Sequence, residues 1–202
     1  LRVDRREDLP ALPGLALGIG TDGELVNSQD LHFFRLDDSA GAALVVCQDV
    51  RIYRLAAAAG EQLVVSLDGN DMYDRNEVYV KFGAVPTTAD YDVAGKEPSR
   101  SDQYFELGPT QAGTYYFMVR ATYVSGSTSD YTLRVDRRSD LTALALGLAT
   151  PGSVGNTQDF RLYRLDALAG ERLVVHLDGD DLYDDNELYV KFGSLPATAA
   201  YD

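Results

Sequence analysis

Acidic and amide side chains are concentrated in one short turn of this 202-residue chain, and the turn occurs twice. Residues 63–83 read LVVSLDGNDMYDRNEVYVKFG, and residues 173–193 read LVVHLDGDDLYDDNELYVKFG. A hard cation such as Ca²⁺ takes about six to eight oxygen ligands from carboxylates, Asn side chains and backbone carbonyls. The oxygen donors of the two turns are Asp68, Asn70, Asp71, Asp74, Asn76 and Glu77, and then Asp178, Asp180, Asp181, Asp184, Asp185, Asn186 and Glu187.

We therefore expect Ca²⁺ at these turns, because so many carboxylates in one turn repel one another without a cation. Arg75 replaces the Asp185 of the second copy, which makes the first site the weaker candidate. The ligand spacing of an EF-hand is absent. The alternative is a solvated turn in which Asp and Asn cap the backbone, and a melting temperature that is independent of calcium would favour it.

Composition narrows the class of protein. The chain carries 32 acidic against 18 basic residues, a net charge of -14, which repels nucleic acid and anionic membranes. No apolar run approaches the roughly 18 residues of a membrane span. Cys47 is the single cysteine, so no intrachain disulfide can form. We expect Cys47 to be a small buried apolar residue.

The elements that carry the turns read as strands. Val78, Val80 and Phe82 alternate with polar residues, which is typical of a half-buried antiparallel strand. Further strands are expected over residues 102–107, 113–122 and 129–136, separated by Gly, Pro and Ser. With 13 Tyr, 7 Phe and 18 Gly, the chain is predicted to be all-β, forming antiparallel β-sandwich or jelly-roll domains repeated in tandem.

The repeat sets the expected domain boundaries. Residues 51–92 align without a gap on residues 161–202, and 29 of these 42 positions are identical. Residues 27–46 also resemble residues 48–65, an internal duplication of about 19 residues that could add a hairpin at a sheet edge or lengthen a link. We expect a closing strand of a preceding repeat (1–6), a linker (7–26), a complete repeat (27–136), a second linker (137–155) and the first half of the next repeat (156–202).

The motifs YRL, AGE.LVV.L, KFG..P, AGTYYFMVRA and SDYTLRV occur in an order that resembles the bacterial pre-peptidase C-terminal domain. The resemblance implies a small β-sandwich appended to secreted peptidases and other exported proteins, without a catalytic site. It is similar to the collagen-binding domain of clostridial collagenases, which implies alternative calcium ligands where a linker meets the sandwich: Asn27, Asp30, Asn156 and Asp159. The acidic turn here is longer than the family pattern.

Catalysis has little support in the sequence. His32 and His176 are the only histidines, and each lies in a predicted strand without a nucleophile motif beside it. Tyrosines 104, 115, 116, 123 and 131 could form an aromatic surface for a polysaccharide or collagen-like ligand. In an alternating strand, however, one residue of each adjacent pair faces the core.

The sequence thus predicts a non-enzymatic, secreted structural protein: a segment of a surface filament or a large adhesin-like array, stabilised by calcium. Its expected partners are neighbouring copies of the same repeat, with a polysaccharide or matrix ligand as a further candidate. The alternatives are an accessory C-terminal array of a secreted peptidase and a carbohydrate- or collagen-binding module. A half repeat such as residues 133–202 is expected to expose a core face and an open sheet edge.

Overall fold

The fold is described from a computed structural model. It describes residues 14–26, 33–36, 43–46, 50–155, 158–179, 183, 185–198 and 200–202. The chain divides into two compact units. Unit 1 is Leu1–Leu141 with Pro151–Leu162, and unit 2 is Thr142–Thr150 with Tyr163–Asp202.

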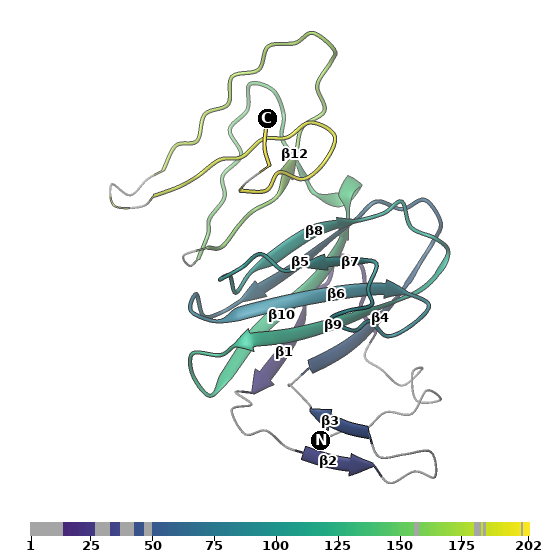
Figure 1. The fold of residues 1–202 in the computed structure, drawn as a ribbon. Helices are drawn as coiled ribbons and strands as arrows, with labels where there is room; N and C mark the ends of the chain where they lie inside the picture. The colour runs from purple at the N-terminus through teal and green to yellow at the C-terminus, as the bar shows by residue number, and fades with distance from the viewer. Residues whose placement is uncertain are drawn as a thin grey trace. The chain divides into compact units, whose positions relative to one another are not determined.

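Unit 1 contains two four-stranded antiparallel sheets (Figure 1). One has the strand order β1-β10-β5-β8 and the other the order β4-β9-β6-β7. The bounds are β1 Thr21–Val26, β4 Val50–Ala57, β5 Leu63–Gly69, β6 Arg75–Phe82, β7 Val93–Gly95, β8 Gln103–Leu107, β9 Gly113–Tyr123 and β10 Thr128–Arg137.

These eight strands follow the jelly-roll path. Counted in chain order without β2 and β3, they run 1-8-3-6 in one sheet and 2-7-4-5 in the other, so the chain crosses repeatedly between the sheets. Both sheets contribute to one buried core, for example Leu67 and Leu133 from the first and Phe117 and Val80 from the second. The predicted all-β sandwich is therefore confirmed for unit 1.

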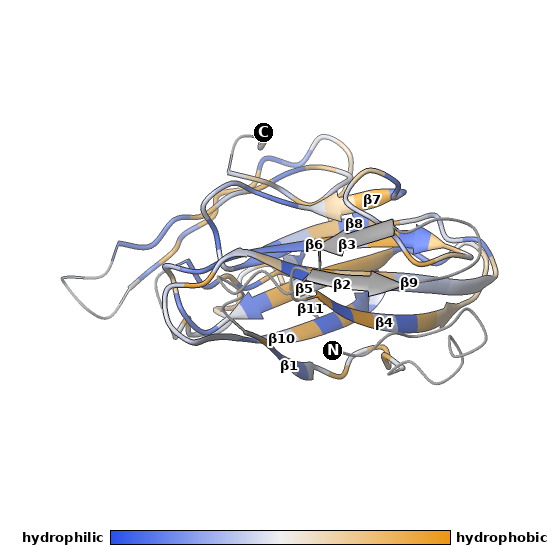
Figure 2. Ribbon diagram, turned by 60° about the horizontal axis from the view of Figure 1, so that its bottom comes forward, coloured by the Kyte–Doolittle hydropathy of each residue, from blue (hydrophilic) through white to orange (hydrophobic). Residues whose placement is uncertain are grey.

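The alternation expected along β6 holds on the core side. Val78 and Val80 are fully buried, and Phe82 packs against the core at the end of the strand. Hydrophobic and hydrophilic residues alternate along β4 and β10 in the same way (Figure 2). Tyr79 points to the other face and is nevertheless buried, because the ring of Tyr91 packs edge-on against it at 5.1 Å.

Two segments expected to be irregular are strands. Residues 21–26, inside the expected linker 7–26, form β1 and pair with β10, and Val93–Gly95, which lies outside the expected strands, forms β7 and pairs with β6. Both carry weak strand signals, because glycine interrupts the first and the second has only three residues. Leu25 of β1 is fully buried, which makes this edge strand part of the core.

Gly23 of β1 occupies a core-facing position where no side chain fits. A Cβ there would lie 2.4 Å from the ring of Tyr131 and 2.6 Å from the hydroxyl of Tyr53. These two buried hydroxyls are hydrogen-bonded to each other at 2.8 Å, and burial and this bond raise the pKa of Tyr131.

We expect Gly23→Ala to lower the free energy of unfolding by about 1–3 kcal/mol, because the added methyl overpacks the core. Urea denaturation measures this change. Gly126→Ala is the matched control, since a Cβ at Gly126 meets nothing within 4 Å, and its expected change is within about 0.5 kcal/mol. Equal stability of the Gly23 and Gly126 variants would contradict the described packing of β1.

The duplicated segment forms a hairpin of its own. β2 (Phe33–Leu36) pairs antiparallel with β3 (Ala43–Val46) as a two-stranded sheet. This hairpin joins neither four-stranded sheet. The duplication therefore lengthens the connection between β1 and β4 rather than adding strands to a sheet of the sandwich.

Arg137 and Arg138, which end the sandwich, pair with its own acidic residues. Arg137 contacts Glu61 at 2.8 Å and Arg138 contacts Glu106 at 3.3 Å. A 3-10 turn, η2 (Arg138–Asp140), follows. Within the described ranges, no helix has both the length and the apolar composition that a membrane crossing requires.

Unit 2 contains one short parallel pair, β11 (Thr142–Ala143) and β12 (Tyr163–Arg164). Residues 173–179 and 185–192 are the sequence counterparts of β5 and β6, and no strand is found in them. Their apolar side chains, among them Val174, Leu177 and Phe192, are exposed.

Candidate metal centre

Three carboxylates of unit 1 come together on the outer side of the β5 and β8 edge. They belong to Asp68 of β5, to Asp102 immediately before β8, and to Asp159 in the segment 151–162. One oxygen from each lies within 4.8 Å of the other two. We call these three residues the acidic cluster.

The strand register brings Asp68 and Asp102 together. Leu67 pairs with Gln103 in the antiparallel β5–β8 ladder. Asp68, the residue after Leu67, is therefore a neighbour of Asp102, the residue before Gln103. Leu67 points into the core, and alternation therefore directs Asp68 to the outer face. The backbone N–H of Gly69 donates to Asp102 Oδ1 at 2.9 Å, and the Ser101 hydroxyl donates to the same oxygen at 3.0 Å.

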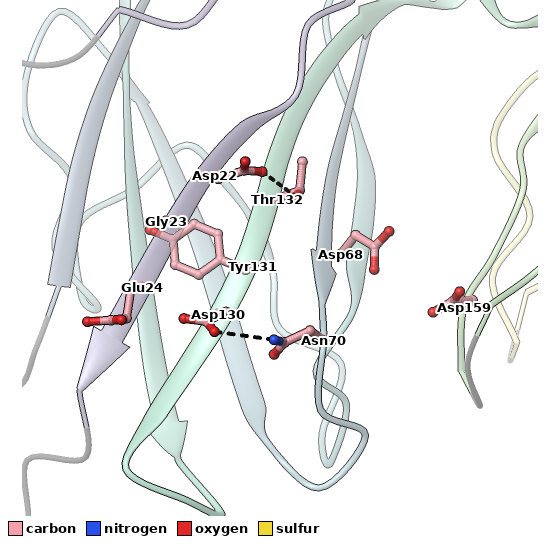
Figure 3. Close-up of a pocket in the computed structure, with 9 residues that line it drawn as sticks. All are labelled: Asp22, Gly23, Glu24, Asp68, Asn70, Asp130, Tyr131, Thr132 and Asp159. Atoms are coloured by element: carbon pink, nitrogen blue, oxygen red, sulfur yellow. Dashed lines mark hydrogen bonds between the residues drawn. The ribbon is translucent and has the colours of Figure 1, made fainter.

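The segment that carries Asp159 also packs on β8 through a ring contact. The rings of Phe160 and Tyr104 lie with their centroids 4.6 Å apart. The N–H of Gly155 donates to Asp159 Oδ2 at 2.7 Å. Figure 3 shows Asp159 beside Asp68 at the edge of an open acidic hollow.

Asp102 is the most buried member of the cluster. Its side chain is 3% exposed, and Oδ2 has no hydrogen-bond partner among the described residues. Burial raises the pKa of Asp102 to about 6, and the charges of Asp68 and Asp159 add to this rise. Burial and the charge of Asp159 also raise the pKa of Asp68. The charge of Arg161 opposes the rise at Asp68, and Oδ2 of Asp102 remains a buried oxygen without a hydrogen-bond donor among the described residues.

Two of the other predicted ligands hold the acidic turn against a neighbouring loop. Asp74 is fully buried, and its Oδ1 accepts from the N–H of Ser125 at 2.7 Å. Asp71 accepts from the Ser125 hydroxyl at 2.9 Å and from the N–H of Tyr73 at 2.9 Å. These contacts are the backbone-capping role that the solvated-turn alternative describes, with the loop at Ser125 as an additional partner.

The remaining predicted ligands of the first copy lie elsewhere. Asn76 is buried and donates to the Ser101 carbonyl at 3.2 Å. Glu77 accepts from the Tyr79 hydroxyl at 2.7 Å and pairs with Arg120 at 3.4 Å. Asn70 donates to Asp130 at 3.4 Å across the hollow of Figure 3.

Of the six donors predicted in the first turn, the structure therefore brings Asp68 alone into the acidic cluster. In the second copy, Asp178, Asp185, Asn186 and Glu187 are exposed. Asp180, Asp181 and Asp184 lie outside the described residues, as do Asn27, Asp30 and Asn156. Calcium binding by the turns themselves stays a prediction.

The five tyrosines do not form one surface. Tyr115 and Tyr131 are buried in the core, as alternation predicted for one residue of each adjacent pair. Tyr104 contacts Phe160, and Tyr123 lies under the guanidinium of Arg75 at 5.5 Å. His176 is exposed in unit 2, and His32 lies outside the described residues.

Comparisons with known proteins agree with part of the sequence-based resemblance. No protein with a curated description is similar in sequence to this chain. Among solved structures, the pre-peptidase C-terminal domain of a Bacillus anthracis collagenase is similar at 15% identity, over 62% of this chain and 94% of that chain, with a TM-score of 0.43.

Two further solved structures are similar at lower TM-scores. PliG, a periplasmic inhibitor of g-type lysozyme from Aeromonas hydrophila, has 17% identity over 62% of this chain and 96% of its own, with a TM-score of 0.35. The C-terminal CBM6 of the laminarinase LamC from Zobellia galactanivorans has 12% identity over 58% of this chain and 100% of its own, with a TM-score of 0.30. The family model that matches is the bacterial pre-peptidase C-terminal domain, over residues 49–121, the stretch that runs from β4 into β9.

Proposed function

We propose that this chain is a non-catalytic module of an exported protein, and that it binds Ca²⁺ through Asp68, Asp102 and Asp159. The observation that carries the proposal is the buried Asp102, which has one oxygen without a hydrogen-bond partner among the described residues and which clusters with two other carboxylates. A bound cation gives this oxygen a partner and offsets the repulsion within the cluster.

The donor set favours calcium among the common protein metals. All three side chains offer carboxylate oxygen, whereas zinc and copper sites are usually built with His or Cys ligands. Calcium accepts irregular oxygen geometry and completes its shell with water, while Mg²⁺ demands a nearly ideal octahedron. Three carboxylates, with water or backbone oxygens completing the shell, would therefore suit Ca²⁺ better than Mg²⁺.

The cation would act as a clamp on the segment 151–162. Its ligands come from β5, from the residue before β8 and from this later segment, which are far apart in the sequence. Binding would add to the Phe160–Tyr104 contact and hold the segment on the sandwich.

Thermal unfolding of matched variants tests the proposal. In 1 mM Ca²⁺, against a chelator, we expect the melting temperature of the native chain to rise by about 5–10 °C for a dissociation constant near 10 µM. Asp68→Asn should remove most of this rise. Asp178→Asn, the same change at the exposed counterpart in the second copy, should leave it intact. An equal calcium response in both variants would rule out the cluster as the binding site.

The role in the whole protein has two candidates, each favoured by one observation. The repeat of 29 identical positions in 42 favours a structural array, such as a surface filament or an adhesin-like chain of neighbouring repeats. The family match over residues 49–121 favours an accessory module of a secreted peptidase. Negative-stain electron microscopy of the native material separates them: beaded fibres that loosen with a chelator support the array, and compact particles support the accessory module.

A further inference from the structure

Unit 2 exposes the side chains that form the core of unit 1. Leu177 is the counterpart of Leu67 in the repeat alignment, and it is 54% exposed where Leu67 is fully buried. Val190 is 52% exposed, whereas its counterpart Val80 is fully buried. The same sequence pattern thus has a packed environment in one copy and an exposed one in the other.

The two copies nevertheless share short-range hydrogen bonds. The N–H of Phe82 donates to Asp92 Oδ2 at 2.7 Å, and the N–H of Phe192 donates to Asp202 Oδ2 at 2.6 Å. A bond from the backbone of Asp92 to Val80 is likewise repeated from Asp202 to Val190, at 2.8 and 3.0 Å. The copies therefore share their short-range contacts and differ in the long-range ones.

The strand order of unit 1 explains this difference. β4 pairs with β9, β5 pairs with β8 and β10, and β6 pairs with β7 and β9. Among the described strands, β4, β5 and β6 never pair with one another. The first half of a repeat therefore contains no two strands that are neighbours in either sheet. A second copy of unit 2 offers only the same three strands and cannot complete the fold.

We propose that unit 2 is an acceptor for the second half of a repeat, a segment with the sequence pattern of residues 93–137. Such a segment would insert its counterpart of β9 between those of β4 and β6, and would flank the counterpart of β5 on both sides. In unit 1 the covering residues are Phe117, Val119, Leu133 and Val135, all in the core. The partner is thus identified by its strand-forming apolar pattern, and the proposal is independent of cation binding.

A linked partner tests this inference. Residues 93–137 are copied onto the chain directly after Asp202, the position that aligns with Asp92. We expect the backbone amides of residues 173–179 and 185–192 to exchange hydrogen at least 100-fold more slowly than in the unextended chain, approaching the rates of residues 63–69 and 75–82. The readout is taken in a chelator, which separates it from the calcium proposal.

The control is the same extension with Phe117→Ser, Val119→Ser, Leu133→Ser and Val135→Ser made in the added copy only. Without apolar side chains to cover Leu177 and Val190, this extension should give no slowing of exchange. Fast exchange with the unaltered extension would overturn the proposal, and so would equal slowing with both extensions. Exchange of residues 63–69 in unit 1 reports on the integrity of the original sandwich in each protein.

Discussion

Asp102→Asn is expected to stabilise the protein in a chelator at pH 7 and to abolish its response to calcium. The pKa of Asp102 is about 6 in the fold against 3.8 in its ordinary range. The folded state therefore holds the proton more tightly than the unfolded state. The stabilising contribution of the neutral side chain is complete below pH 3.8 and is lost as pH rises through about 6.

At pH 7 the ionised Asp102 thus costs the metal-free fold about 2–3 kcal/mol. Asparagine avoids this cost, because it carries no charge and its amide oxygen can still accept from Gly69 and Ser101. In a chelator, lowering the pH from 7 to 5 should therefore increase the stability of the native chain through the protonation of Asp102. Asp102→Asn should lack this increase. Calorimetric melting at the two pH values measures both effects.

In calcium we expect the native chain to be more stable than Asp102→Asn, because Ca²⁺ binds the ionised cluster of the native chain. The native chain should gain stability from 1 mM Ca²⁺ at pH 7 and gain less at pH 5, where protons compete for Asp102. Asp74→Asn is the matched control: Asp74 is equally buried but lies outside the acidic cluster. Loss of the calcium response in Asp74→Asn, with retention in Asp102→Asn, would instead locate the ion in the acidic turn.

The strands that could be predicted from the sequence are those in which apolar residues that face the core alternate with polar residues. β8, β9 and β10 begin and end within one residue of their expected bounds. β1 was missed because Gly23 occupies an inward position, where alternation would lead one to expect an apolar side chain. Its place is determined by two tyrosines from other strands, which a local pattern does not reveal.

The acidic cluster was only partly predictable for the same reason. Asp68 belongs to a dense acidic turn and was expected as a ligand. Asp102 is an isolated acid before a strand, and its role depends on the β5–β8 register. Asp159 was suggested only by the resemblance to collagen-binding domains. Density of acids along the chain therefore indicated one ligand, whereas the proximity of the three carboxylates comes from pairing between distant segments.

Leu67→Ala and Leu177→Ala are the same substitution in two copies of one sequence, and we expect very different results. Leu67 is fully buried between the sheets, so its truncation leaves a cavity and should lower the free energy of unfolding by about 2–5 kcal/mol. Leu177 is 54% exposed, so the same truncation should change it by less than about 0.5 kcal/mol. Urea denaturation followed by tyrosine fluorescence measures both values.

The pair of leucine variants also measures how far unit 2 contributes to the cooperative fold. Because the residues around the two leucines are nearly identical, LVVSLDG against LVVHLDG, local propensity cancels in the comparison. The difference that remains is the long-range packing that the jelly-roll order supplies to the first copy alone. A loss of several kcal/mol in Leu177→Ala would show that the second copy is packed in solution, and equal small effects would show that the first is not. With the linked partner of residues 93–137 in place, the cost of Leu177→Ala should rise toward that of Leu67→Ala, because the same strands would then cover both side chains.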